Sequence, residues 1–458
     1  MINDTIGAIS TPAGEGGIAV IRVSGPDSVA IVDRVFATKN GLANAPTHTV
    51  HYGFVKNPET GEKIEEALVT VMRAPRSFTK EDVVEVSCHG GYIAVKKVLE
   101  LLLEMGIRLA EPGEFTKRAF INGRIDLSQA EAVIDLIRAK SDRAFALAMK
   151  QAQGKLSEQI RGIRQTLLEL MAHIEVNIDY PEHDVAEMTN NLVTERCKEA
   201  LDAIDRLLAT AGQGKILREG IVTAIIGRPN VGKSSLLNLL TRENRAIVTD
   251  IPGTTRDVIE EYVTVAGIPL RLLDTAGIRE TNDVVEKIGV ERSKSALADA
   301  DLILFVISQN EPLAQDERAL LDEVKDRQTI CVVNKTDLPR KLDLAEIYAR
   351  FSGERVVPLS AVTQEGLGDL ENAISRLFFS GKLEANDLTY VSNVRHIQLL
   401  KNAKQALLDA SLAVERLIPI DMIQIDIRKA WEELGEIIGE EVGESLLDQI
   451  FSQFCLGK

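Results

Sequence analysis

The chain has 458 residues, a formal net charge of −16 at pH 7, four cysteines and 45% hydrophobic residues. This length allows roughly three domains of about 150 residues each. The acidic balance argues against a protein that coats nucleic acid non-specifically, because phosphate neutralisation needs clustered Lys and Arg. The isolated cysteines give no metal half-site or disulfide framework, and no segment has the pattern of a signal peptide or membrane span. We therefore expect a soluble cytoplasmic protein.

The first part of the chain, from Thr5 to about Gly90, has short strand-like runs separated by Gly, Pro and Asn turns. Helical stretches follow Pro26 and Gly91. This pattern predicts a compact α+β domain, which we assign to residues 1–118.

Beyond this domain the hydrophobic period becomes helical. Apolar residues recur every three or four positions between Leu167 and Ala211, and again between Leu400 and Leu417. Each block has an apolar face with no partner in its own segment. The simplest solution is one discontinuous helical domain, formed by residues 119–216 and 382–458, and the alternative is two independent helical domains.

The segment Thr116–Gln165 is locally basic, with ten basic residues against five acidic ones. Such a patch could face RNA or could be a solvated helix surface, and the sequence leaves both open. The basic residues are Lys117, Arg118, Arg124, Arg138, Lys140, Arg143, Lys150, Lys155, Arg161 and Arg164.

The central segment, residues 217–381, alternates apolar runs with helical stretches. Near-continuous apolar runs are typical of a parallel sheet that is covered on both faces. We therefore expect an inserted α/β domain. Its expected strands are residues 221–226, 270–273, 302–307, 330–333 and 356–359.

Five short motifs follow one another in this segment. They are Gly227-Arg228-Pro229-Asn230-Val231-Gly232-Lys233-Ser234, Gly253-Thr254-Thr255, Asp274-Thr275-Ala276-Gly277, Asn334-Lys335-Thr336-Asp337 and Ser360-Ala361. Any one of them could arise by chance, but five in this order are the signature of a guanine-nucleotide switch. The segment is therefore predicted to be a P-loop GTPase domain of the Ras or Era type.

The Gly227 loop has the context that phosphate binding needs, because it follows an apolar strand and opens a helix at Lys233. Its backbone N–H groups and the helix N-terminus can cradle phosphates, and Lys233 can neutralise the β and γ groups. The Ser234 hydroxyl is expected to reach Mg²⁺. Asp274 is expected to hold the metal through water, and the Gly277 N–H to sense the γ-phosphate.

The Asn334–Asp337 motif predicts the base. The Asp337 carboxylate can accept hydrogen bonds from N1–H and from the exocyclic amine of guanine, whereas adenine offers no such pair of donors. GTP is therefore the expected ligand. We predict contacts from Asn230, Val231, Gly232, Lys233, Ser234, Ser235, Thr249, Asp250, Ile251, Pro252, Gly253, Thr254, Thr255, Asp274, Thr275, Ala276, Gly277, Asn334, Lys335, Thr336, Asp337, Ser360 and Ala361.

The catalytic residues are less evident. In the Ras pattern a glutamine after the D-x-x-G motif orients the attacking water, but here Ile278 occupies this position. Glu280, Asp283 and Glu286 are the acids that could take over this role, and each could equally be an ordinary exposed acid. No arginine finger is evident. Asn230 and the stretch 249–254 could hold a monovalent cation instead, or Asn230 could only shape the loop.

Residues outside the GTPase motifs resemble the MnmE (TrmE) tRNA-modification GTPases along the whole chain. They are Thr11-Pro12, Gly16-Gly17, Arg22, Pro112-Gly113-Glu114-Phe115, Arg118-Ala119-Phe120, Asp126-Leu127, Gln129-Ala130-Glu131-Ala132 and the terminal Phe454-Cys455-Leu456-Gly457-Lys458. The resemblance implies a folate-binding, homodimerising N-terminal domain. It also implies that the protein and an FAD-dependent partner, MnmG (GidA), form a heterotetramer or larger complex. Together they would add an aminomethyl or carboxymethylaminomethyl group to C5 of the wobble uridine of certain tRNAs.

The resemblance also implies particular ligands by position. Contacts to 5-formyltetrahydrofolate or a related tetrahydrofolate would come from Arg22, Glu85, Arg124 and Lys458. Potassium ligands would be Asn230, Thr249, Ile251 and Thr254, and magnesium ligands Ser234 and Thr255. Asn230, Lys233 and Glu286 would be catalytic.

Cys455 lies in the terminal tag, where it could have a redox or nucleophilic role or form an apolar plug with Phe454 and Leu456. The competing function is a ribosome-assembly or regulatory GTPase without modification chemistry. Such a switch would share every nucleotide motif, so these motifs cannot separate the two. The N-terminal α+β domain and the Cys455 tag favour tRNA modification, because an assembly factor typically carries an RNA-binding module at its ends.

Overall fold

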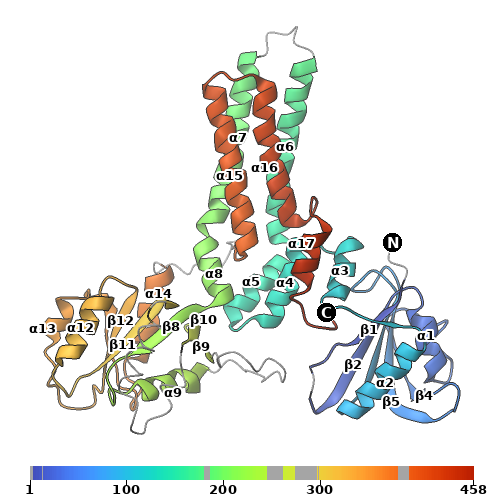
Figure 1. The fold of residues 1–458 in the computed structure, drawn as a ribbon, viewed down its shortest axis with the longest axis horizontal. Coiled ribbons are helices and arrows are strands. Elements are labelled where there is room, and N and C mark those ends of the chain that lie inside the picture. Colours follow the sequence, from blue (N-terminus) through green and yellow to red (C-terminus); the bar gives the residue numbers. More distant parts are fainter. Residues whose placement is uncertain are drawn as a thin grey trace.

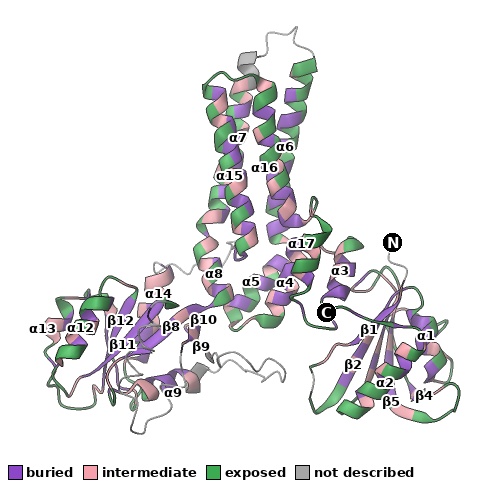
Figure 2. Ribbon diagram, in the orientation of Figure 1, coloured by how far each residue is buried: buried purple, intermediate pink, exposed green. Residues whose placement is uncertain are grey.

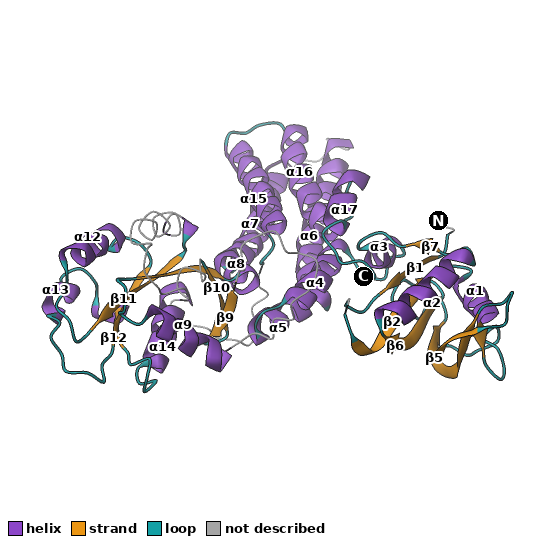
Figure 3. Cartoon of the chain, turned by 60° about the horizontal axis from the view of Figure 1, so that its bottom comes forward, coloured by secondary structure: helices purple, strands orange, loops and turns teal. Residues whose placement is uncertain are grey.

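The computed structural model describes residues 4–12, 14–179, 186–244, 261–273, 297, 299–379 and 391–458. Figure 1 shows a long helical bundle with one sheet-containing domain on each side of its base. Figure 3, which brings the base forward, shows the same separation of the two orange sheets by purple helices. The expected arrangement of an α+β domain, a helical domain and an inserted α/β domain is confirmed.

The N-terminal domain is built on a sheet whose described strands number seven, in the order β3-β4-β5-β6-β2-β1-β7. Helices α1 and α2 pack on one face, where the core cluster joins strand residues such as Ile21 and Val69 to helix residues such as Val32 and Val98. Its elements are β1 (Ile6–Ile9), β2 (Gly16–Ser24), α1 (Ser28–Val35), β3 (Phe36–Ala37), β4 (Thr49–Lys56), β5 (Lys63–Met72), β6 (Val83–Gly90), α2 (Tyr92–Glu104), β7 (Arg108–Leu109) and α3 (Glu114–Ile121).

The helical domain is formed by two segments that are far apart in the sequence. One core cluster contains Leu167 and Ile204 from the first segment with Leu400 and Ile427 from the second. Figure 2 shows buried positions recurring along the long helices of the bundle. The described helices are α4 (Leu127–Arg138), α5 (Asp142–Ala152), α6 (Lys155–Asp179), α7 (Ala186–Ala209), α8 (Ala211–Glu219), α15 (Val394–Glu415), α16 (Ile420–Ile438) and α17 (Glu444–Phe451).

The prediction of one discontinuous helical domain is therefore confirmed, and the alternative of two independent helical domains is wrong. None of the described helices combines the length and the apolar composition that spanning a bilayer requires.

The inserted domain has a sheet whose described strands follow the order β13-β12-β11-β8-β10-β9. Strands β11 and β12 are buried at every residue, because separate core clusters cover the two faces of the sheet. The elements are β8 (Ile221–Ile226), α9 (Lys233–Asn244), β9 (Glu261–Val265), β10 (Ile268–Leu272), β11 (Leu302–Ser308), α12 (Gln315–Val324), β12 (Thr329–Asn334), α13 (Leu344–Tyr348), η1 (Gly353–Arg355), β13 (Val356–Pro358) and α14 (Leu367–Phe379).

One strand of this sheet is not among those expected. Strand β9 pairs antiparallel with β10, whereas the other described pairs are parallel. Only Ala266 and Gly267 join the two strands, and their φ angles are 51° and 78°. A two-residue turn with positive φ values makes a hairpin, because a parallel connection needs a much longer crossover.

Within the bundle, the buried Arg164 of α6 lies against Gly435 of α16. The Arg164 guanidinium is 3.8 Å from the centre of the Trp431 ring, donates to the Trp431 carbonyl at 3.1 Å and pairs with Glu440. A methyl group added at Gly435 would lie 2.9 Å from the Arg164 Nη2. Because Arg164 is only 5% exposed and its guanidinium is held on several sides, the group has little freedom to move away.

We therefore expect Gly435→Ala to lower the stability of the bundle by about 1–3 kcal/mol, through overpacking. Gly162→Ala, in the middle of α6, is the matched control because nothing lies within 4 Å of the added methyl group. It should raise stability by about 0.5–1 kcal/mol, through helix propensity. Thermal unfolding followed by circular dichroism measures both, and a stabilised Gly435→Ala protein would contradict the packing described.

Candidate functional site

The phosphate loop, residues 227–232, connects β8 to α9 and depends on two glycines. Gly227 has a φ of 151°, and a Cβ there would lie 2.2 Å from the Val306 carbonyl oxygen. Gly232 has a φ of 101°, and its Cβ would lie 2.1 Å from the Asn334 Nδ2. Only glycine fits these positions, so the loop can lie close against β11 and the end of β12.

Lys233 opens α9 and folds back across this loop. Its Nζ donates to the carbonyl oxygens of Gly227 and Arg228, at 2.7 Å in each case. Burial lowers the pKa of Lys233, because the loop removes the ammonium group from water. The arrangement places a positive charge beside a helix N-terminus, which is the electrostatic environment that a phosphate group requires.

Asn230, at the edge of the loop, is exposed and has a φ of 64°. Asparagine adopts this left-handed conformation more readily than most residues, which explains its place in the turn. Asn230 therefore both shapes the loop and presents an exposed side-chain oxygen.

Asn334 joins the phosphate loop to the Ser360-Ala361 loop. Its Nδ2 donates to the Val231 carbonyl at 2.9 Å, and its Oδ1 accepts from the Ala361 N–H at 3.1 Å. The side chain is 2% exposed, so both ends of the amide are satisfied inside the domain. Sequence reasoning grouped Asn334 with the base contacts. In the structure its amide fixes the distance between the two loops, and its contact with the nucleotide stays a prediction.

Asp337 is exposed and is oriented by the buried Ser360. The Ser360 hydroxyl donates to the Asp337 Oδ1 at 2.6 Å and accepts from the Thr363 N–H at 3.2 Å. Lys335, between the two motif residues, has a φ of 64°. The carboxylate keeps free acceptor capacity on its exposed side, so it can take the paired donors of a guanine edge.

Eleven of the predicted nucleotide residues lie outside the described part of the chain, as do four residues considered for catalysis. These are Thr249, Asp250, Ile251, Pro252, Gly253, Thr254, Thr255, Asp274, Thr275, Ala276 and Gly277, with Ile278, Glu280, Asp283 and Glu286. The geometry above therefore comes from the phosphate loop and the base-selecting loops.

A second cluster joins the N-terminal sheet to the end of the chain. Arg22 on β2 lies opposite Glu85 on β6, and its Nε and Nη2 both approach the Glu85 Oε1 at 2.9 Å. The Arg22 Nη1 donates to the Gly457 carbonyl at 3.3 Å, and the Ser10 hydroxyl donates to the same oxygen at 3.2 Å. Gly457 has a φ of 87°, and a Cβ there would lie 2.4 Å from the Ile9 carbonyl oxygen.

Aromatic rings connect Arg22 to the predicted folate residue Arg124. The Arg22 guanidinium carbon is 5.7 Å from the centre of the Phe115 ring, and that of Arg124 is 5.0 Å from the Phe78 ring. Phe78 packs against the small core cluster that contains Phe115. Lys458 follows Gly457 in the sequence, and its backbone N–H donates to the Cys455 carbonyl at 3.3 Å.

The structure thus places Arg22, Glu85 and the chain terminus together and puts Arg124 on the far side of an aromatic cluster. Sequence reasoning missed Ser10 and the anchoring role of Gly457. The only signal for either was the glycine before the last residue. In the tag itself, Phe454 is buried and Cys455 is exposed, so the apolar plug is formed by the phenylalanine.

The basic residues between 116 and 165 do not share one face. Arg118 is fully buried, where it pairs with Asp4, Glu81 and Glu114. Arg164 is buried in the bundle. These two arginines therefore neither face RNA nor form a solvated surface, and their role is structural.

The comparisons with known proteins cover the whole chain. Residues 5–124 match the family description GTP-binding protein TrmE N-terminus, and residues 127–455 match MnmE helical domain. A protein named tRNA modification GTPase MnmE from Geobacillus kaustophilus is 60% identical over 458 residues, which cover 99% of each chain. The protein of this name from Listeria innocua is 59% identical over 456 residues, again 99% of each.

Among solved structures, the G domain of the T. maritima FeoB iron transporter is 29% identical to this chain, with a TM-score of 0.26. It covers 34% of this chain and 98% of its own length. At this TM-score the likeness supports no conclusion.

We expect Asp337→Asn to weaken GTP binding about 100-fold, because an amide cannot accept both guanine donors. The variant should gain affinity for xanthosine triphosphate, whose base offers a complementary acceptor. Titration with fluorescent derivatives of both nucleotides measures the change. Asp326→Asn, which changes an exposed acid of the same domain, is the control and should bind as the wild type does. Unchanged GTP affinity in the Asp337 variant would refute the assignment.

Proposed function

Because the chain belongs to the MnmE family of tRNA modification GTPases, we propose a particular chemistry for it. It hydrolyses GTP in a potassium-dependent manner and, with a flavoprotein partner, adds a carboxymethylaminomethyl or aminomethyl group to C5 of a tRNA wobble uridine. The observation that carries the proposal is the 60% identity along the full length of a tRNA modification GTPase. The phosphate loop and the Ser360–Asp337 pair support the GTPase step.

For hydrolysis we propose that Lys233 and the loop backbone bind the β- and γ-phosphates. Ser234 and Thr255 would hold Mg²⁺, which neutralises charge on the phosphates. Ser234 lies at the N-terminus of α9, where a hydroxyl fits this role. Glu286 would orient the attacking water, directly or through a second water.

Asn230, Thr249, Ile251 and Thr254 would hold K⁺, which supplies positive charge where other GTPases use an arginine. The exposed side chain and left-handed backbone of Asn230 suit such a ligand, because they present an amide oxygen at the open edge of the phosphate loop.

For the one-carbon step we propose that a tetrahydrofolate binds near Arg22, Glu85, Arg124 and Lys458. The pterin ring of a folate has a donor edge that suits the Glu85 carboxylate, and the folate ends in a glutamate tail that suits arginine or lysine. The aromatic cluster of Phe78 and Phe115 offers apolar surface between the two arginines. When bound, the folate supplies the one-carbon unit, and this chain contributes its binding and orientation. Cys455, in the C-terminal segment that precedes Lys458, is exposed, and its redox or nucleophilic role stays a prediction.

The partners in this proposal are tRNA, a second copy of the chain and the FAD-dependent protein MnmG (GidA), in a heterotetramer or larger complex. The N-terminal sheet supports self-association, since α1 and α2 cover one face while Ile18, Val50, Tyr52 and Leu68 are exposed from its strands. An apolar sheet face of this kind suits burial against another molecule. With tRNA as the substrate, we place the protein in the cytoplasm.

We expect replacement of K⁺ by Na⁺ to lower the rate of GTP hydrolysis about 10-fold or more, because the positive charge at the phosphates is lost. Asn230→Ala should lose the stimulation by K⁺, while its rate in Na⁺ matches that of the wild type. Phosphate release measured in both salts, with nucleotide affinity as the control, tests this. Equal wild-type rates in the two salts would rule out the cation site.

Cells that lack this protein should contain tRNAs with an unmodified wobble uridine at the affected positions. Nucleoside mass spectrometry after complementation provides the test. The wild-type gene should restore the modified uridine, and Lys233→Ala should not, because phosphate binding is lost. Intact modified uridines in the deletion strain would reject the proposed chemistry and would favour a regulatory or ribosome-assembly switch.

A further inference from the structure

Helix α4 contacts both covalent connections of the inserted GTPase domain. The chain leaves the helical domain through α8, which is followed by Gly220 and β8. Near the end of α8, the Arg218 Nε donates to the Asp135 Oδ1 of α4 at 2.9 Å. Strand β8 runs from this connection into the phosphate loop, so one strand links the Asp135 contact to the nucleotide-binding segment.

The returning connection is held by Glu131, one turn earlier on the same face of α4. Its Oε1 accepts from the Asn393 Nδ2 at 3.0 Å, and its Oε2 lies 2.7 Å from both the Arg395 Nη2 and the His396 Nε2. Burial alone would raise the pKa of Glu131, but His396 and Arg395 lower it to about 2. Two carboxylates of one helix therefore fasten both ends of the inserted domain.

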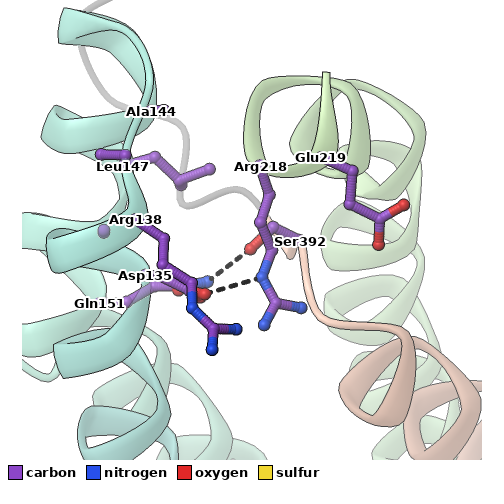
Figure 4. Close-up of a pocket in the computed structure, with 10 residues that line it drawn as sticks. Asp135, Arg138, Ala144, Leu147, Gln151, Arg218, Glu219 and Ser392 are labelled. Carbon is purple, nitrogen blue, oxygen red and sulfur yellow. Dashed lines mark hydrogen bonds and ion pairs between the residues drawn. The ribbon is translucent and has the colours of Figure 1, made fainter. Parts of the chain in front are cut away.

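A pocket of about 260 Å³ lies beside these contacts, so the junction is not closely packed. Asp135, Arg138, Gln151, Arg218 and Ser392 are among its lining residues. Figure 4 shows Arg218 reaching Asp135, and Gln151 reaching Ser392, across this space. Because tightly packed interiors resist small displacements, a pocket at this junction leaves room for the connections to shift against α4.

The loop that follows α4 contacts the sheet of the inserted domain itself. The Thr264 hydroxyl of β9 donates to the Lys140 carbonyl at 3.1 Å, and the Lys140 Nζ is 5.7 Å from the centre of the Tyr262 ring. The β9–β10 hairpin lies in the sequence between the two predicted switch motifs, which end at Thr255 and begin at Asp274. The hairpin therefore joins the stretch of sequence between these two motifs to the end of α4.

Helix α4 also packs against the C-terminal tail. Leu127, Ala130 and Ile134 form one apolar cluster with Phe451 and Phe454. On the next turn, the Arg138 Nη2 donates to the Gln453 carbonyl at 2.8 Å. The tail then continues through Cys455 to Gly457, whose carbonyl accepts from Arg22.

We propose that Asp135 and Arg138 are positioning residues, which couple the nucleotide state of the GTPase domain to the position of the C-terminal tail beside Arg22. Asp135 acts through Arg218 at the nucleotide end, and Arg138 acts through Gln453 at the tail end. The inference rests on the proposed function, because it assumes that the GTPase cycle serves chemistry near the tail. Such coupling is reciprocal, so occupation of the tail site changes nucleotide affinity by the same factor.

Cys455 gives a readout that needs neither folate nor tRNA. It is exposed, whereas Cys88, Cys197 and Cys331 are buried, so a maleimide reports on the tail of the intact protein. The alkylation rate is measured with GDP, and with GDP plus aluminium fluoride, in Mg²⁺ and K⁺. In the wild type we expect the two rates to differ about fivefold or more, the lower range of typical coupling. Equal rates would overturn the proposal.

The variants Asp135→Asn and Arg138→Met remove the two proposed contacts. Both should hydrolyse GTP within about twofold of the wild type, but the difference in Cys455 alkylation between nucleotide states should fall below about twofold. Arg138 is exposed, so its substitution leaves the fold intact even if loss of the partially buried Asp135 charge does not. Arg416→Met, at the far end of α15, is the matched control and should keep the wild-type difference.

The outcomes separate this inference from the proposed function. Failure of the wild type to release phosphate from GTP would contradict both the coupling and the proposed function. Normal hydrolysis with nucleotide-dependent alkylation retained in Arg138→Met would overturn the coupling and leave the proposed function standing. A loss of hydrolysis in Arg138→Met would also contradict it, because the contact would then serve the GTPase step itself.

Discussion

The buried Glu131 carboxylate is the interaction on which the assembly of this chain depends. A domain inserted into a helical bundle must leave and return at one place, and Glu131 holds the return through Asn393, Arg395 and His396. Removing one partner of a buried ion pair costs about 3–5 kcal/mol, because the remaining charge has no compensation. The two halves of the bundle are therefore joined by charge at their base and by apolar packing along their length.

In the nucleotide site, some residues face the expected ligand and others hold the loops in place. Lys233 and Asp337 face the positions where phosphate and base are expected, while Asn334 and Ser360 are buried and hold the loops that carry them. Preorganised donors and acceptors bind strongly because they lose little freedom when the ligand arrives. A substitution at Asn334 would thus affect two loops at once, because its side-chain amide donates to one loop and accepts from the other.

What the sequence could predict follows from how local each signal is. The phosphate loop and the strands around it depend on residues that are adjacent in the chain, and apolar periodicity was sufficient to pair the two helical blocks across the inserted domain. The antiparallel β9, the Arg164–Gly435 contact and the Ser10–Gly457 hydrogen bond involve other constraints. Each depends on a turn conformation or on residues far apart in sequence, which periodicity and short motifs do not encode.

The position of the tail explains why both ends of the chain belong to one site. Arg22 is committed to Glu85 within the sheet, yet its remaining nitrogen reaches the carbonyl of the penultimate residue. Because Gly457 lies against the Ile9 carbonyl, no larger residue fits there without displacing the tail. The tail in turn is packed on α4 through Phe451 and Phe454. The N-terminal domain can therefore complete this cluster only when the helical domain is correctly folded, and a displacement of α4 would also displace the tail that contacts Arg22.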